Sequence, residues 1–444
     1  MMLSGRSMTV GEMCMTADHQ KNSVPFMEAT PSVALVDERV SIQARGYAAR
    51  QEVTLRASMP AEGPREWEAS ATFTADQNGA IEPALQAPLA GTYDGCDAMG
   101  LFWSMQRLRH AEHRSSLEPP GLAPMTITLT AEAHDQPLVS TTLHRLFMAA
   151  DVTRTVVREA DLVGTLFHPA GRGPHPAILV LGGSDGGVTE EPAALLASHG
   201  YVTLALAYFG VAPLPAQFVQ IPLDYIGMAI TWLHAHPGVS GDRIAVWGGS
   251  KGAELALLAA ATFPQIRAVV GWMPSAVVSQ GLAEGEPLSS WTYRGAPLPF
   301  APFLVTDTEW QTMLASPPLS LRTLYESMWR DPAAVERATI HVEQITGPVF
   351  LVSGTDDQMW PSSTFAALVI DRLRQHQRPY RSAHVHYPGA GHGIMFPYLP
   401  TTTSTEMSDG VLSYAKGGTP ALNAHAGSHA WSAMLAFLAE SLQP

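Results

Sequence analysis

The sequence predicts an α/β protein in which an N-terminal β-sandwich precedes a doubly wound parallel sheet. Three observations support this fold class. Short stretches of alternating apolar and polar residues end near residue 150, and longer unbroken apolar runs alternate with amphipathic segments after it. The 444 residues are also too many for one simple core. We therefore expect a sandwich over residues 26–150 and a second domain over residues 151–444.

The first domain is predicted from a period-two alternation that is typical of half-buried strands. The stretches concerned are VSIQA from Val40, VTLRA from Val53, ATFTA from Ala71 and TITLT from Thr126. Turn signals such as Asn78-Gly79 and the PPG at 119–121 separate them, with no long helical pattern between. This favours a β-sandwich, in which we find no catalytic grouping. Residues 1–25, with several methionines, are expected to form a flexible leader.

The second domain is predicted from apolar runs of the kind that form strands covered on both faces. These runs are AILVLGG (177–183), YVTLALAYF (201–209), IAVWGG (244–249), IRAVVGW (266–272) and VFLVSG (349–354). Amphipathic helical patterns lie between or after them, at residues 224–236, 364–376 and 429–442. Strands that alternate with helices indicate a doubly wound sheet, whose ligands bind at the carboxyl ends of its strands.

A nucleophilic serine is predicted at Ser250, within WGGSKGA (247–253). The serine of a Gly-x-Ser-x-Gly motif in an α/β-hydrolase lies on a sharp turn between a strand and a helix. RIAVWGG before Ser250 has the pattern of a strand, and KGAELALLAAATF after it has that of a helix. Gly248 and Gly252 flank the serine, where side chains would clash in so tight a turn. The second domain is therefore expected to be an α/β-hydrolase.

The same pattern occurs earlier, in LGGSDGG (181–187), but there no helix comes directly after it. The two glycines after Asp185 delay a helix until about Thr189, which is a suitable N-cap residue. We therefore interpret this copy as a loop whose backbone N–H groups, around Gly183 and Ser184, contribute to an oxyanion hole. The alternative is a turn with no chemistry. The second oxyanion donor of this fold is the residue after the nucleophile, here Lys251.

The acid and the base are expected on loops after later strands, in the chain order serine, acid, histidine. The run VFLVSG is followed by TDDQMWP, which offers Asp356 and Asp357, and the loop pattern favours Asp357. In HVHYPGAGHGI, His392 lies in a glycine-flanked loop beyond the strand and is the predicted base. Residues 275–340, rich in Pro and Trp, are predicted to form a lid over the pocket.

Neither a metal nor a cofactor is predicted. His384 and His386 would share one face of a strand, and His425 and His429 are four residues apart near a helix start. No H-E-x-x-H motif and no cysteine cluster accompanies them, so packed or exposed histidines are the expected outcome. The side chain of Lys251 has two interpretations: it contacts an anionic substrate, or it is solvated.

Composition limits the partners and the compartment. The net charge of −14 disfavours nucleic acid and anionic membranes as partners. Cys14 and Cys96 are far apart, which favours two free thiols in a reducing compartment over a disulfide. We find no secretory signal, no apolar stretch long enough to span a membrane, and no peroxisomal tripeptide in the final SLQP. A soluble, cytoplasmic protein is therefore expected.

Several segments resemble the acyl-CoA thioesterase and bile acid-CoA:amino acid N-acyltransferase family. They are GGSKGAEL, GTDDQMW and GAGHGI, together with AMGLFWSM (98–105), GYVTLALAYFGVAPLP (200–215) and HPGVSGDRIAVWGGSKG (236–252). The likeness runs from about residue 30 to the C-terminus, and MGLFWSM in the sandwich makes it more specific. The resemblance places the family's Ser-or-Cys, Asp and His on Ser250, Asp357 and His392.

The resemblance implies an acyl-CoA thioester as substrate and hydrolysis through an acyl-serine, because members that transfer acyl groups to amino acids usually carry cysteine at the nucleophile. Three alternatives stay open: transfer of the acyl group to an amine or alcohol, a carboxylesterase or lactone hydrolase, and a non-catalytic binding module with the same fold. The acyl chain, the CoA contacts and any homo-oligomer are not encoded in recognisable motifs.

Overall fold

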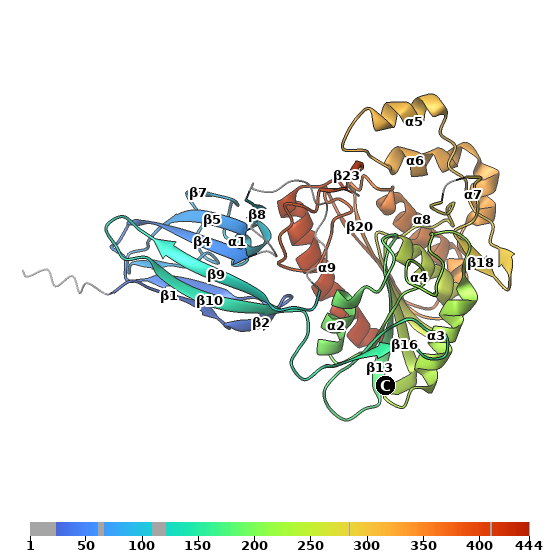
Figure 1. Ribbon diagram of the computed structural model, residues 1–444, viewed down its shortest axis with the longest axis horizontal. Coiled ribbons are helices and arrows are strands. Elements are labelled where there is room, and N and C mark those ends of the chain that lie inside the picture. The colour runs from blue at the N-terminus through green and yellow to red at the C-terminus, as the bar shows by residue number, and fades with distance from the viewer. Residues whose placement is uncertain (1–23, 61–65, 109–120, 284, 409–410, 444) are drawn as a thin grey trace, which may run out of the picture.

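The computed structural model describes residues 24–60, 66–108, 121–283, 285–408 and 411–443. It confirms the predicted fold class, with an N-terminal β-sandwich beside a larger α/β domain (Figure 1). The predicted leader lies outside the described residues except for Val24 and Pro25, and Cys14 and the two prolines of the PPG lie outside them as well. Cys96 is described and is an exposed free thiol.

The sandwich consists of two sheets packed around one core. The smaller sheet has the order β1 (Phe26–Thr30), β3 (Ser41–Arg45), β6 (Ala80–Ile81). The larger has the order β2 (Val33–Leu35), β10 (Val139–Leu146), β9 (Met125–Glu132), β4 (Glu52–Pro60), β5 (Glu66–Thr74), β7 (Ala90–Gly91), with β8 (Gln106–Arg107) also beside β5. The four predicted strands are β3, β4, β5 and β9. Every second residue of β4 is buried, as the alternation predicted.

The MGLFWSM segment forms a short helix, α1 (Gly100–Trp103), that the strand pattern did not predict. All four of its residues are buried in the sandwich core. Gly100 is required there, because a Cβ atom at this position would lie 2.3 Å from the ring of Tyr93. The helix therefore fits against the sheet only through a residue without a side chain.

The α/β domain is built on a sheet that has eight strands within the described residues. Their order is β11 (Thr153–Val157), β12 (Gly164–His168), β14 (Val202–Leu206), β13 (His175–Leu181), β16 (Val239–Gly249), β17 (Ile266–Trp272), β20 (Val349–Gly354), β21 (Ser382–Tyr387). From β14 onward all neighbours are parallel, but β11 and β12 pair antiparallel at one edge. The sequence did not predict these two. Four of the five residues of β11 are exposed and leave no apolar pattern, whereas β12 is buried but has only five residues, two of them polar.

Helices cover both faces of this sheet, as expected for a doubly wound fold. One face packs against α3 (Leu223–Ala235), α4 (Lys251–Thr262) and α8 (Ser362–Gln375), and the other against α2 (Glu190–Ser198) and α9 (Pro420–Ser441). The predicted helix 429–442 is only the later part of α9. The helix begins earlier because the Thr419 side chain accepts a hydrogen bond from the N–H of Leu422, and Pro420 occupies the first turn.

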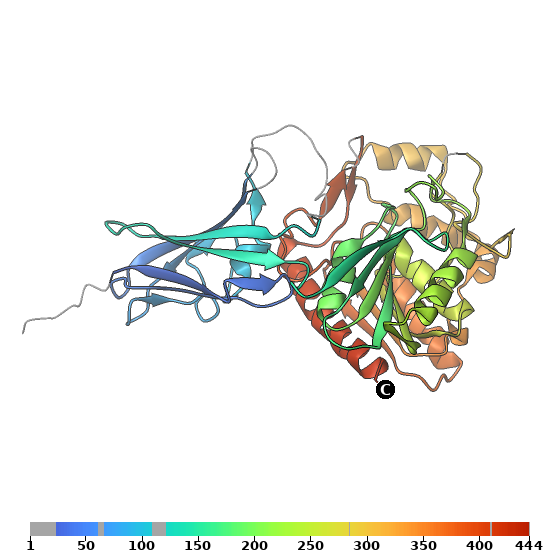
Figure 2. The ribbon, with the colours of Figure 1, turned by 60° about the horizontal axis from the view of Figure 1, so that its bottom comes forward.

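Helix α9 lies between the sandwich and the α/β sheet in both views (Figures 1 and 2). Among the described residues, two polar contacts join it to the sandwich. The indole N–H of Trp431 donates to Asp37 Oδ2 at 2.7 Å, and His425 Nε2 lies 3.2 Å from Asp97 Oδ2. Asp37 Oδ2 also lies 2.5 Å from Nε2 of His199, the C-cap residue of α2. One buried carboxylate therefore links the sandwich to α9 and to the end of α2.

The segment predicted as a lid, 275–340, lies on the side of the α/β domain away from the sandwich (Figure 1). It contains β18 (Trp291–Tyr293), β19 (Ala296–Pro297), α5 (Asp307–Leu314), α6 (Arg322–Glu326), η1 (Ser327–Arg330) and α7 (Pro332–Ala338). Its first part is anchored, since Val277, Trp291 and Ala301 are buried in the main core. By contrast, α5 has no buried residue. Movement of the segment over a pocket stays a prediction.

The remaining short elements connect these parts. Strand β15 (Ile221–Pro222) pairs with β18, η2 (Val342–Gln344) precedes β20, and β22 (Glu406–Ser408) pairs with β23 (Ser413–Ala415). In the described part of the chain, no helix combines the length and the apolar character that crossing a membrane requires.

Candidate active site

Ser250 lies at the junction of β16 and α4, as the motif predicted. Its backbone has φ 55° and ψ −124°, a conformation that side chains rarely adopt and that marks a strained turn. The turn leaves no room for neighbouring side chains: a Cβ at Gly248 would lie 2.0 Å from the carbonyl oxygen of Gly252. The N–H of Ser250 donates to the carbonyl of Trp272 on the adjacent strand at 2.8 Å, which holds the turn against the sheet.

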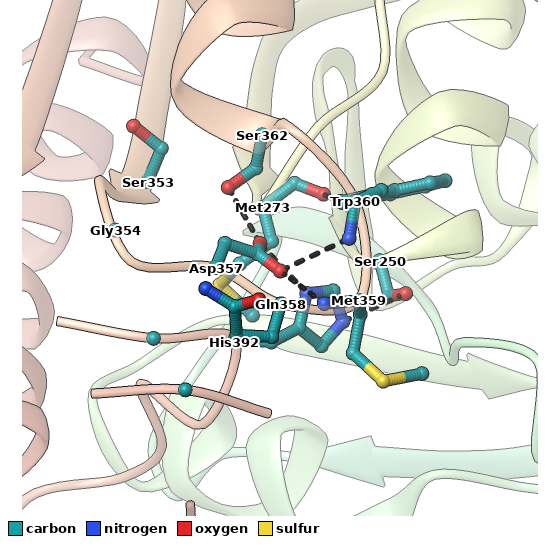
Figure 3. Close-up of polar contacts among 12 residues, drawn as sticks. Ser250, Met273, Ser353, Gly354, Asp357, Gln358, Met359, Trp360, Ser362 and His392 are labelled. Atoms are coloured by element: carbon teal, nitrogen blue, oxygen red, sulfur yellow. Dashed lines mark hydrogen bonds and ion pairs between the residues drawn. The ribbon is translucent and has the colours of Figure 1, made fainter. Parts of the chain in front are cut away.

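His392 and Asp357 meet Ser250 in a continuous hydrogen-bonded line (Figure 3). His392 Nδ1 lies 2.8 Å from Asp357 Oδ2, and His392 Nε2 lies 3.0 Å from Ser250 Oγ. The aspartate is fully buried and the histidine is 9% exposed. An ionised carboxylate can only accept, so Nδ1 carries the proton and Nε2 is left to accept from the serine hydroxyl. The structure therefore brings together the three residues that the sequence singled out.

The Asp357 carboxylate is held by three further hydrogen bonds. Oδ1 accepts from the N–H groups of Met359 (3.0 Å) and Trp360 (3.2 Å), and Oδ2 accepts from the Ser362 hydroxyl at 2.6 Å. The neighbouring Asp356 points elsewhere and accepts from Gln358 Nε2 and from the N–H of Gly418. The choice of Asp357 over Asp356 thus agrees with the geometry. Ser362 opens α8, and its contact was not predicted.

His392 is fixed on two sides. Its backbone N–H donates to the carbonyl of Lys416 at 2.7 Å, and the Trp360 ring and the imidazole pack in an edge-to-face arrangement with centroids 6.1 Å apart. Lys416 comes from the segment after β23 and was not singled out in the sequence. Burial lowers the pKa of the Lys416 ammonium, and the charges of Asp185 and Asp357 oppose this effect.

The loop around Ser184 lies directly beside Ser250. A Cβ at Gly183 would lie 3.4 Å from the Cβ of Ser250, and one at Gly252 would lie 2.2 Å from the carbonyl oxygen of Gly182. The delay of the helix is as predicted: Gly186 and Gly187 have φ of 73° and 74°, and α2 begins only at Glu190. Thr189 occupies the N-cap position, but its side chain makes no capping hydrogen bond.

Tyr208 holds this loop in place and was missed in the sequence. Its buried hydroxyl lies 2.6 Å from the carbonyl oxygen of Gly182 and 3.2 Å from that of Gly183. The C=O and N–H of a trans peptide point in opposite directions. Fixing the Gly183 carbonyl on Tyr208 therefore also fixes the direction of the Ser184 N–H. The only signal in the sequence was an aromatic residue near the end of the predicted strand run 201–209, two residues beyond the end of β14.

The Lys251 side chain fits neither of its two predicted interpretations. It is 1% exposed, so it is not solvated, and its ammonium already has partners within the protein. Nζ lies 2.8 Å from both carboxylate oxygens of Glu254, 2.8 Å from Ser279 Oγ and 3.0 Å from Ser290 Oγ. Burial lowers the pKa of Lys251, and the Glu254 carboxylate opposes this. The side chain is buried because Ser279, Ser290 and Trp291 lie over the start of α4.

Three of the four histidines considered as metal ligands have separate hydrogen-bond partners, and the fourth, His386, lies beside His384 with ring centroids 5.6 Å apart. His384 Nε2 lies 2.7 Å from Ser353 Oγ, and burial together with His386 lowers the pKa of His384 to about 4. His425 faces Asp97, whereas His429 Nδ1 lies 2.7 Å from the Tyr387 hydroxyl. Among the residues that the structure describes, no group of three His, Cys, Asp or Glu side chains is placed to hold a metal ion.

Comparisons with known proteins cover both domains. Residues 221–444 match the family model described as BAAT / Acyl-CoA thioester hydrolase C terminal, and residues 37–159 match the one described as Acyl-CoA thioester hydrolase/BAAT N-terminal region. The chain is similar to mouse acyl-coenzyme A thioesterase 6, with 33% identity over 91% of this chain and 94% of the relative. It is also similar to mouse bile acid-CoA:amino acid N-acyltransferase, with 32% identity over 94% and 98% of the two chains.

Solved structures are more distant. A thermostable carboxylesterase cloned from a metagenomic library aligns over 66% of this chain and 90% of its own, with 16% identity and a TM-score of 0.39. A puromycin-hydrolysing peptidase of Mycobacterium tuberculosis aligns over 92% of this chain and 53% of its own, with 12% identity and a TM-score of 0.42.

Proposed function

The chain belongs to the acyl-CoA thioester hydrolase/bile acid-CoA:amino acid N-acyltransferase family, and from that premise we propose that it hydrolyses acyl-CoA thioesters with Ser250 as nucleophile. The observation that carries the proposal is the line from Asp357 through His392 to Ser250, with distances of 2.8 and 3.0 Å. These three side chains come from separate loops and meet at one edge of the sheet. A stable fold does not require these three polar side chains to be hydrogen-bonded to one another.

In the first half of the reaction, Ser250 Oγ attacks the thioester carbonyl while His392 Nε2 takes its proton. Asp357 holds the imidazole in the required tautomer and stabilises its positive charge. The carbonyl oxygen becomes negative, and the N–H groups of Lys251 and of the Gly183–Ser184 region are the proposed donors to it. One such donor is typically worth about 3 kcal/mol in the transition state.

The C–S bond then breaks as His392 Nε2 passes its proton to the departing sulfur, so CoA leaves as a thiol and His392 is neutral again. A thiol has a pKa of about 8.5, so this leaving group needs little help from an acid. Water then attacks the acyl-serine, with His392 as base, and releases the free acid. Each proton that His392 accepts is returned to a leaving group, so the enzyme ends in its starting state.

Acyl transfer to an amine or alcohol is the second candidate. The relatives named thioesterase and those named N-acyltransferase are almost equally similar to this chain, at 33% and 32% identity. Hydrolysis is favoured by the serine at position 250, where acyl-transferring relatives usually carry cysteine. A carboxylesterase or lactone hydrolase would use the same three residues, and differs from both in needing no CoA.

The test measures thiol release from acyl-CoA substrates of graded chain length, with and without glycine or taurine, and identifies the products by mass spectrometry. We expect free acid as the main product and an acyl adduct on Ser250 in a rapidly quenched reaction. A Ser250→Ala protein is the control for uncatalysed hydrolysis. Amide as the main product would establish the acyltransferase, and turnover of simple esters or lactones alone would establish the third candidate.

Replacing the nucleophile probes what decides between water and an amine. An acyl-thioester intermediate is more reactive toward amines than an oxygen ester, so Ser250→Cys should raise the ratio of amide to acid when glycine or taurine is supplied. Substrate binding should change little, because one oxygen is exchanged for one sulfur. A cysteine variant that yields only acid would show that the acceptor site, and not the nucleophile atom, sets the outcome.

The cytoplasmic location and an oligomeric state stay predictions. Among the relatives, one is named peroxisomal and another mitochondrial. Cell fractionation and light scattering on the purified protein are the corresponding measurements.

A further inference from the structure

A buried charged cluster lies directly behind the proposed nucleophile. We call it the Lys251 cluster; it consists of Lys251 and Glu254 from the first turn of α4, and Ser279, Ser290 and Trp291 from the segment that crosses it. All five residues are at most 1% exposed. The cluster therefore joins the helix that begins after Ser250 to a part of the chain about 30 to 40 residues further on.

Every strong polar group in the cluster has a partner. The ammonium contacts the Glu254 carboxylate and both serine hydroxyls, and the Trp291 indole N–H donates to Glu254 Oε1 at 2.8 Å. The Ser290 hydroxyl in turn donates to the carbonyl of Ser279 at 2.8 Å. The rings of Phe218 and Trp291 face the ammonium, with centroids 5.1 and 5.6 Å from Nζ.

Stability alone is a poor explanation for this arrangement. Two charges lose their hydration on burial, and apolar side chains of the same size are often as stabilising or more so. A lysine in the first turn is also unfavourable for the helix dipole, which is positive at that end. What the cluster does provide is a rigid, directional attachment for the residue after the nucleophile, because four contacts fix one side chain.

The cluster also extends to the loop around Ser184. Phe218 and Trp291 pack against Tyr208, with ring centroids 6.3 and 6.0 Å apart, and Phe209 contacts Phe218 at 4.9 Å. Tyr208 binds the carbonyls of that loop, and the carbonyl of Phe209 accepts from the N–H of Gly187 at 3.1 Å. One continuous buried structure thus supports both loops beside Ser250.

We propose that Lys251 and Glu254 are positioning residues. Their buried ion pair sets the direction of the backbone N–H of Lys251. Through the aromatic side chains, it also sets the position of the loop at Gly183–Ser184, which holds the other oxyanion donor. The inference rests on the proposed function, because it concerns the oxyanion of that reaction. In this proposal, neither the Lys251 nor the Glu254 side chain touches the substrate. The pair acts in the transition state alone, since only there does the carbonyl oxygen carry the charge that these N–H groups stabilise.

The test compares Lys251→Met and Glu254→Gln with the wild type in three measurements: kcat, KM, and the affinity for two CoA ligands. One ligand is an alkyl thioether of CoA, which cannot react, and the other is a trifluoromethyl ketone analogue, which forms an oxyanion adduct with the serine. We expect kcat and the ketone affinity to fall together by about 10- to 100-fold, with KM and thioether affinity within about threefold. Asp371→Asn, which removes an exposed ion pair with Arg374 on α8, is the matched control.

Folding is separated from positioning by the double variant Lys251→Met/Glu254→Gln, which leaves no unpaired buried charge. Recovered thermal stability with a kcat that stays low supports the inference, whereas recovery of both overturns it. If neither charge variant accumulates as folded protein, Ser290→Ala removes a single contact and is measured in the same way. Unchanged kcat in that variant also overturns the inference. A wild type that forms no ketone adduct at Ser250 would instead contradict the proposed function itself.

Discussion

The loops at 181–187 and 247–253 share the pattern Gly-x-Ser-x-Gly and leave neighbouring strands at the same edge of the sheet, since Leu181 pairs with Gly248. The conformations of the two loops differ because the residues after each serine differ. After Ser250 a helix begins at the next residue, and the serine is forced into a positive φ. After Ser184 two glycines in left-handed conformations delay the helix, and the serine stays exposed.

The comparison also shows that the two loops depend on each other. A side chain at Gly252 would collide with the carbonyls of Leu181 and Gly182, at 2.3 and 2.2 Å from the added atom. The first loop is thus the surface on which the turn of the second is packed. A short motif identifies a candidate, but the neighbouring secondary structure indicates which copy is the better candidate for the nucleophile.

The largest expected effect separates the two serines. Ser250→Ala should lower kcat on the order of 10⁶-fold, as loss of the nucleophile does in a serine protease. Ser184→Ala should stay within about fivefold of the wild type, because a hydroxyl is lost and the backbone N–H remains. Steady-state thiol release decides between them, and a dead Ser184→Ala beside an active Ser250→Ala would reverse the assignment of the two loops.

The two aspartates after β20 allow the same contrast on the acid. Asp357→Asn should lower kcat by about 10⁴-fold, since the amide would favour the wrong tautomer of His392. Asp356→Asn, whose side chain contacts Gln358 and Gly418 instead, should cost less than about tenfold. Both proteins should unfold near the wild-type temperature, and equal losses of kcat would leave the choice of Asp357 without support.

A smaller effect is expected from the residue that holds the first loop. Tyr208→Phe removes the hydroxyl that binds the carbonyls of Gly182 and Gly183, and should lower kcat about tenfold with KM unchanged. Tyr47→Phe is the matched control, because the Tyr47 hydroxyl is buried in the sandwich without a hydrogen-bond partner in the described structure. A kcat at the wild-type level in Tyr208→Phe would show that the loop keeps its shape unaided.

The smallest effect concerns a contact remote from both loops. The hydrogen bond to Asp97 raises the pKa of His425 above its ordinary value. Its stabilising contribution is therefore complete below about pH 6.5 and is lost as the pH rises through the raised value. The His425 side chain is largely exposed, so the wild type should lose only about 1 °C more than His425→Gln in unfolding temperature between pH 6 and pH 8. Turnover should be the same in both proteins, and a change of kcat would connect the sandwich contact to the active site.

Much of the site was accessible from the sequence because its signals are local. Ser250 is marked by a strand, two glycines and a helix within a few residues, and Asp357 and His392 each come after a recognisable strand. The same holds for α3 and α8, whose apolar stripes are continuous. Where several local signals agree, the fold has few alternatives.

The supporting contacts were not accessible, because they join residues far apart in the chain. The two serine partners of Lys251 lie 28 and 39 residues later, and Tyr208 contacts Gly183 across 25 residues. A lysine in the first turn of a helix has no feature that distinguishes a buried side chain from a solvated one until the segment that covers it is placed. For the same reason the start of α9 was placed too late: its early residues face the sandwich and the site loops, and carry no simple stripe.

The carboxylate of Asp37 has a consequence for synthesis on the ribosome. Its partner Trp431 lies 394 residues further along the chain, which corresponds to roughly 20 to 80 s of translation at about 5–20 residues per second. During that interval the nascent sandwich carries a hydrated carboxylate where the finished protein has a buried one. The contact between the sandwich and α9 therefore forms only after nearly the whole chain has been made, and the carboxylate loses its hydration at that step.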